Sequence, residues 1–158
     1  RCKDMEQKNW NIMQLQKCLD EKISTQDKLM QEGLSEAGKD YSRFFEWTAD
    51  ELYRANFLRN CYRSIKERVE QCSSVGDLQE CLENILKSGR NDLLIHSQAR
   101  YSTNPMANLA YTLERECTQK LIEDCCSFSH ILSMKPPQQD VREKNGLPVK
   151  KKSNGLKM

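Results

Sequence analysis

The chain has 158 residues, of which 37% are hydrophobic and 30% are charged, and its formal net charge is +2. This length suits one domain with its own core, and the low hydrophobic fraction favours small amphipathic helices over a thick α/β core. No stretch approaches the roughly 18 apolar residues of a membrane span, so the sequence predicts no transmembrane segment.

Cysteine content is the strongest compositional signal. Eight cysteines are present, at Cys2, Cys18, Cys61, Cys72, Cys81, Cys117, Cys125 and Cys126. An even number this large is typical of a secreted chain held by disulfides, and the start at Arg1, without Met, fits a mature chain after removal of a signal peptide. The alternative is a cytosolic protein with free thiols. No C-x2-C pair occurs, so we expect neither zinc nor any other metal.

The first predicted helix runs from about Lys3 to Gln31, where apolar residues recur at helical spacing. Gly33 predicts a left-handed stop just after it. Cys2 and Cys18 lie about 24 Å apart on this helix, at 1.5 Å per residue, so each is expected to bond to another element.

An aromatic cluster follows between Asp40 and Trp47, with four of the eleven aromatic residues of the chain. In a helix, Tyr41, Phe44 and Phe45 share a face and Trp47 points elsewhere, so one contact surface does not bury all four. Packing in the core is the favoured interpretation. The alternative is an exposed patch, in which Tyr41, Phe45 and Trp47 would contact a partner.

The most regular pattern lies between Thr48 and Gly89. Thr48 to Glu51 has the form of a capping box, which predicts a helix start. Apolar residues then step by three and four along one seam: Ala55, Leu58, Tyr62, Ile65, Val69 and Cys72. Ser74 predicts the start of a second helix that ends at Gly89, so the two form an αα-hairpin. Three arginines beside the seam are predicted to be free for a partner: Arg54, Arg59 and Arg63.

Asn104-Pro105 predicts the start of the last helix, with a cap followed by Pro at the first helical position, and its pattern continues to about Ser133. Cys125 and Cys126 are expected to point in different directions and to tie this helix to two neighbours, which makes it a hub.

Pro136-Pro137 ends the pattern, and the rest of the chain is predicted to be a disordered basic tail. From Met134 onward it carries seven Lys or Arg and two acids, which leaves the preceding body at about −3. Lys150, Lys151 and Lys152 are the candidate anion-binding residues of this tail. A solvated segment is the favoured interpretation, because no aromatic residues that would stack on bases lie among the lysines.

Catalytic motifs are absent from the sequence. His96 and His130 are the only histidines, and neither G-x-S-x-G nor a glycine-rich phosphate loop occurs. The catalytic helix of secreted phospholipases has the pattern D-x-C-C-x-x-H-D. In this sequence His130 is one residue too far from the Cys125-Cys126 pair to fit that pattern. Adjacent carboxylates such as Glu123 and Asp124 are expected on helix surfaces. We therefore expect no enzymatic activity and no cofactor.

The spacing Cys18-x42-Cys61-x10-Cys72-x8-Cys81 is similar to the last four cysteine positions of insect odorant-binding proteins, helical carriers of small apolar ligands. The similarity covers roughly the first half of the chain. In that family three residues separate the second and third cysteines, and this sequence has no such pair. The family also normally ends soon after its last cysteine, whereas 77 residues follow Cys81 here.

The sequence thus predicts an all-α bundle of four to five helices, stapled by about four disulfides, at residues 1–133, with the basic tail at 134–158. The leading hypothesis for its function is a secreted, extracellular ligand or effector that binds another extracellular protein. The alternative is a carrier of a small hydrophobic ligand in the bundle core. We expect no specific nucleic-acid partner.

Overall fold

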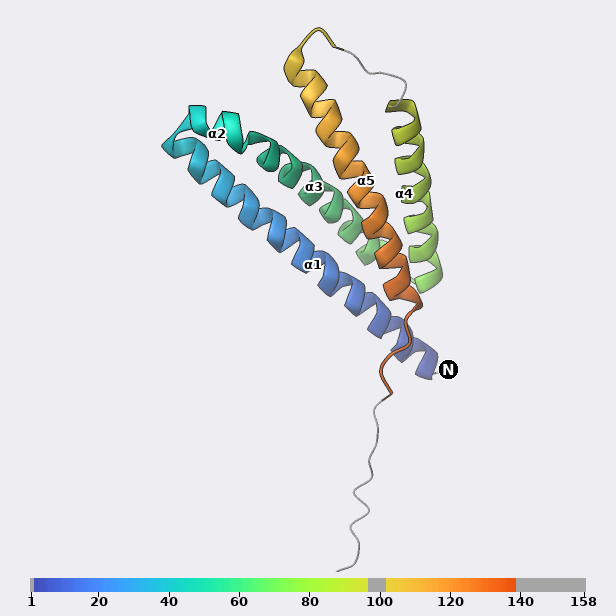
Figure 1. Cartoon of the computed structure of the whole chain (residues 1–158). Coiled ribbons are helices and arrows are strands. Elements are labelled where there is room, and N and C mark those ends of the chain that lie inside the picture. Colours follow the sequence, from blue (N-terminus) through green and yellow to red (C-terminus); the bar gives the residue numbers. More distant parts are fainter. Residues whose placement is uncertain (1, 97–101, 139–158) are drawn as a thin grey trace, which may run out of the picture.

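A computed structural model describes residues 2–96 and 102–138, with side chains described at 10–94 and 102–138. This part of the chain is all-α and contains no strand. Its helices are α1 (Cys2–Lys39), α2 (Tyr41–Trp47), α3 (Ala49–Gln71), α4 (Val75–His96) and α5 (Pro105–Ser133) (Figure 1). None of these helices is long and apolar enough to cross a membrane. The predicted all-α class and helical bundle are therefore confirmed.

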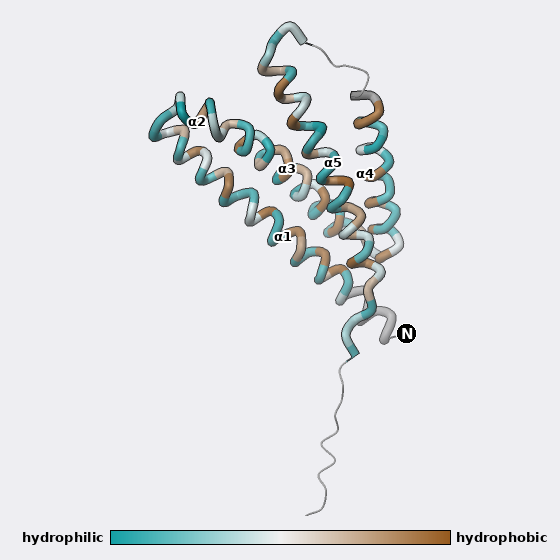
Figure 2. Tube along the Cα trace, viewed as in Figure 1, coloured by the Kyte–Doolittle hydropathy of each residue, from teal (hydrophilic) through white to brown (hydrophobic). Residues whose placement is uncertain are grey.

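The helices form two antiparallel pairs (Figure 1). α1 and α3 lie side by side and are joined through the short α2, while α4 packs along α5. α5 contacts α1, α3 and α4 and is therefore a hub of the packing. The predicted means is wrong, because Cys125 and Cys126 are free thiols and do not tie α5 to its neighbours. Hydrophobic and hydrophilic residues alternate along the helices, as expected for amphipathic elements that each bury one face (Figure 2).

The predicted seam of α3 forms the centre of the core. Ala55, Leu58, Tyr62, Ile65 and Val69 are all buried. All of them except Ala55 belong to one core cluster. The cluster also contains Leu15 and Leu19 of α1, Leu78 and Leu82 of α4, and Phe128 and Leu132 of α5. The seam prediction is confirmed for these five residues, because spacing of three and four keeps one face of a helix toward its neighbours. Cys72, the sixth predicted seam residue, is the C-cap of α3 and is only partly buried.

Two glycines predicted as helix ends lie inside helices instead. Gly33 is buried within α1, where an added Cβ would lie 3.1 Å from Leu52 Cδ1. Gly89 lies within α4, where a Cβ would lie 3.2 Å from Ile122 Cγ1 of α5. Both stop predictions are wrong, because these positions need a missing side chain for close helix packing and do not need a left-handed backbone.

The caps give mixed results. Asn104 accepts a hydrogen bond from the Met106 amide at 3.0 Å, and Ser74 accepts one from the Asp77 amide at 3.1 Å, so both predicted starts are confirmed. The predicted helix start at Thr48 is confirmed, because Thr48 is the N-cap residue of α3, but the capping box itself is wrong, since the Thr48 side chain makes no capping hydrogen bond. The Thr48 amide instead donates to the Phe44 carbonyl, because α2 ends there as α3 begins.

Asn11 fastens the end of α5 to α1. This residue is 2% exposed, and its Nδ2 donates to the carbonyls of Ile131 at 2.9 Å and Met134 at 2.8 Å. Carbonyls in the last turn of a helix have no intrahelical partner, so a buried amide donor satisfies them. α5 ends at Ser133, at the predicted end of the helical domain. The predicted anion-binding residues Lys150, Lys151 and Lys152 lie outside the described residues.

The described cysteines form no disulfide bond in this structure. Those residues are Cys18, Cys61, Cys72, Cys81, Cys117, Cys125 and Cys126, and all are free thiols. Cys117 and Cys125 lie in the core, where thiols act as small apolar side chains. Burial raises the pKa of Cys117 to about 11 and that of Cys125 to about 12. In the described part of the chain, the helices are therefore joined by side-chain packing and not by the expected disulfides. The side chain of Cys2 lies outside the described residues.

Cys125 and Cys126 point in different directions, as predicted. Cys125 is fully buried, whereas Cys126 is exposed on the same helix. Neighbouring positions on a helix differ by about a quarter turn or more, so adjacent cysteines have different surroundings.

Candidate functional site

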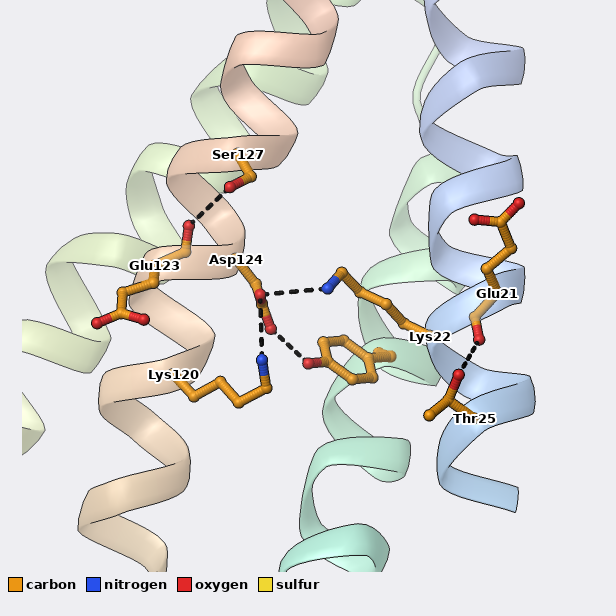
Figure 3. A network of polar contacts seen from close by, with 8 residues as sticks. Glu21, Lys22, Thr25, Lys120, Glu123, Asp124 and Ser127 are labelled. Atoms are coloured by element: carbon orange, nitrogen blue, oxygen red, sulfur yellow. Dashed lines mark hydrogen bonds and ion pairs between the residues drawn. The ribbon is translucent and has the colours of Figure 1, made fainter. Parts of the chain in front are cut away.

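A buried carboxylate joins three helices of the bundle (Figure 3). The Tyr62 hydroxyl of α3 donates to Asp124 Oδ2 of α5. Lys22 Nζ of α1 lies 3.3 Å from Asp124 Oδ1, and Lys120 Nζ lies 3.6 Å from the same oxygen. Lys22 also lies 5.8 Å from the centroid of the Tyr62 ring, within range of a cation–π contact.

The chemistry of this cluster is structural. Burial, with the hydrogen bond to Asp124, raises the pKa of Tyr62 well above its usual range, so the phenol remains a donor. Both oxygens of Asp124 are engaged by protein donors, and the carboxylate side chain is only 10% exposed. We therefore interpret the cluster as an electrostatic brace between α1, α3 and α5.

Sequence reasoning missed this brace by assigning Asp124 to the helix surface. Asp124 is in fact 7% exposed. The signal was present in the spacing, since Cys117, Leu121, Asp124 and Phe128 step by four, three and four along α5. An acid at a seam position indicates a buried carboxylate with partners, because an unpaired one is costly to bury.

The aromatic tip, defined as Tyr41, Phe45 and Trp47 of α2, is the most exposed aromatic cluster described. These side chains are 67%, 48% and 76% exposed, respectively, whereas Phe44 is buried at 7%. The core interpretation is therefore wrong for three of the four aromatic residues, because a helix of seven residues turns only one face toward the bundle. Tyr41 and Phe45 stack with ring centroids 6.2 Å apart. Asp40 fixes the start of α2 by accepting from the Arg43 amide.

The three candidate arginines are not free, contrary to prediction. Arg54 Nη2 lies 3.0 Å from Glu116 Oε2 of α5. Arg59 Nη1 and Arg63 Nη2 lie 3.4 Å and 3.5 Å from the same oxygen of Asp27 in α1. These ion pairs connect α3 to its two neighbours, because the arginines flank the buried seam and face the acids of the adjoining helices. The three arginines thus connect helices of the bundle, whereas the aromatic tip is exposed to solvent.

An apolar groove runs along the side of α3. It has a volume of about 440 Å³ and is lined by residues of α3, with Ile85 of α4 and Leu121 of α5 opposite. Tyr53 and Arg68 are its first and last residues on α3. The Tyr53 hydroxyl donates to Glu114 at 2.8 Å, and this bond raises the pKa of Tyr53 to about 12. The groove was not predicted, because it lies between helices whose placement sequence periodicity does not fix.

No group of three or more potential metal ligands occurs among the described side chains. Comparison with known proteins gives no match to a protein family, to a curated protein or to a solved structure.

Proposed function

We propose that this protein is a secreted, non-enzymatic helical protein that acts by binding another extracellular protein through the aromatic tip. The observation that carries this proposal is the exposure of Tyr41, Phe45 and Trp47 together on one short helix. Tryptophan and tyrosine are enriched among residues that dominate binding energy, and their rigid rings lose little conformational entropy on binding.

The position of the tip supports this role. α2 lies at the turn between α1 and α3, at the far end of that helix pair from the C-terminal end of α5 (Figure 1). A partner can therefore cover the tip without disturbing the core around Tyr62. Stacking of Tyr41 on Phe45 also holds two of the rings in place before binding.

Secretion is proposed from the eight cysteines, and disulfides among them are proposed for the secreted form. The carrier alternative, with a ligand inside the bundle, has less support. The centre of the bundle is filled by large, fully buried side chains, among them Tyr62, Phe128, Leu15 and Leu19. The apolar groove lies beside this core.

The proposal is tested by screening the purified protein against an array of extracellular protein ectodomains and measuring Kd for each bound ectodomain by surface plasmon resonance. Trp47→Ala is expected to weaken binding by about 30-fold, as for a hot-spot residue worth about 2 kcal/mol. The triple variant that also carries Tyr41→Ala and Phe45→Ala is expected to lose binding. Met13→Ala is the matched control, since Met13 is 62% exposed near the other end of α1.

Circular dichroism of each variant establishes that the helices are retained. The proposal is overturned if no ectodomain binds, or if the triple variant binds as tightly as the Met13→Ala control.

A further inference from the structure

The groove beside α3 exists because the four long helices pack as two pairs. α3 turns its seam toward α1 and α5, while α4 packs along α5 and has little contact with α3. Gly89, one helical turn after Ile85 in α4, lets α4 approach Ile122 of α5 closely. The flank of α3 is therefore left facing α4 across a gap whose floor includes Leu121.

The lining of the groove extends along most of α3. Its α3 lining steps alternately by three residues and by one from Tyr53 to Arg68. Fifteen residues of α-helix span about 22 Å, at 1.5 Å per residue. Its apolar side chains are Phe57, Ile65, Ile85 and Leu121. The volume of about 440 Å³ is in the range of small-molecule sites.

Charge is confined to one end of this groove. Arg68 is the single charged residue among those that line it. Unlike Arg54, Arg59 and Arg63, Arg68 forms no ion pair with a described residue; its Nη1 donates only to the Cys81 thiol, at 3.9 Å. A guanidinium without a carboxylate partner, beside an apolar groove, is complementary to a ligand with one anionic head and an apolar chain.

We propose that this groove binds a long-chain aliphatic carboxylate. The chain lies along α3 against Phe57, Ile65, Ile85 and Leu121, and the carboxylate accepts hydrogen bonds from the Arg68 guanidinium. Each buried methylene contributes to affinity, and the ion pair fixes the orientation of the ligand. This site is separate from the aromatic tip, so the two proposals stand or fall independently.

The test uses palmitate, below the concentration at which it forms micelles, with isothermal titration calorimetry on the full chain. Cetyl alcohol, which has the same chain length and no charge, is expected to bind about tenfold more weakly. Butyrate, which has the head group and almost no chain, is expected not to bind.

Arg68→Gln is expected to weaken palmitate binding about tenfold and to leave cetyl alcohol binding unchanged. Arg90→Gln is the matched control, because Arg90 is an exposed arginine of α4 outside the groove lining. Ser64→Trp places a large ring in the groove from an exposed position and is expected to abolish binding of both ligands.

A second measurement needs no variant. Cys61 lines the groove and Cys126 is exposed on α5, outside it. In the reduced protein, saturating palmitate is expected to slow alkylation of Cys61 at least fivefold and to leave Cys126 unaffected. The proposal is overturned if palmitate does not bind, if Arg68→Gln matches Arg90→Gln, or if palmitate leaves alkylation of Cys61 unchanged. If a helix of a partner protein displaced palmitate, and Arg68→Gln did not change palmitate binding, the groove would be assigned to that protein instead.

Discussion

Removal of the Asp124 carboxylate tests the brace between α1, α3 and α5. Asp124→Ala leaves the Tyr62 hydroxyl without its acceptor, and Tyr62 is 0% exposed. An unsatisfied buried polar group costs about 1–3 kcal/mol. The Lys22 and Lys120 side chains are 29% and 50% exposed, so they reach water, and their lost ion pairs add about 1 kcal/mol at most. The free energy of unfolding is expected to fall by about 1–4 kcal/mol.

The assay is equilibrium unfolding in urea, monitored by far-ultraviolet circular dichroism. An unchanged slope of the free energy of unfolding against urea concentration indicates that the folded state is intact. Glu123→Ala is the control, since this neighbouring carboxylate is exposed, and its effect is expected to stay within about 0.5 kcal/mol.

A double variant separates the hydrogen bond from general damage at the site. Asp124→Leu combined with Tyr62→Phe removes donor and acceptor together, so no polar group of this pair remains unpaired. It is expected to be about 1–2 kcal/mol more stable than the sum of the single effects predicts. Strict additivity, or an Asp124→Ala protein as stable as Glu123→Ala, would show that the reasoning about the brace is wrong.

Two further predictions concern the glycines and the thiols. The new Cβ of Gly38→Ala has no atom within 4 Å, so this variant is expected to raise the free energy of unfolding by about 0.5–1 kcal/mol. The new Cβ of Gly33→Ala lies 3.1 Å from Leu52, so this variant is expected to be at least about 1 kcal/mol less stable than Gly38→Ala in urea unfolding. Equal unfolding midpoints for the two variants would contradict this prediction. In the reduced protein, the folded-state pKa of Cys117 and Cys125 is raised from 9.0 to about 11 and about 12, so stability is retained below pH 9 and is lost as the pH rises toward these values, by about 1.4 kcal/mol per pH unit for each thiol. Urea unfolding between pH 8 and 10.5 (roughly the window in which only the unfolded thiols ionise) measures this slope, and substituting both cysteines by alanine is expected to flatten it; an unchanged slope would rule out the two thiols as its source.

The helical class and the core seam were predictable because both depend on local sequence. Residues at spacing three and four lie on one helix face whatever the partner, so Leu58, Tyr62 and Ile65 could be assigned to the core from order alone. The caps at Ser74 and Asn104 were predictable for the same reason, since each donor and acceptor lie within three residues.

Tertiary structure decided the features in which one residue type has two roles. A glycine can end a helix or allow two helices to approach, and Leu52 beside Gly33 decides for the second role. An acid on a helix can face water or close a buried hydrogen bond, and the Tyr62 hydroxyl decides the case of Asp124. These choices depend on the free energy of contact with another element, which the periodicity of a single helix does not contain. For the same reason, the sequence placed Trp47 among the aromatic residues of one short helix, but only the packing of α2 against α1 and α3 left it exposed.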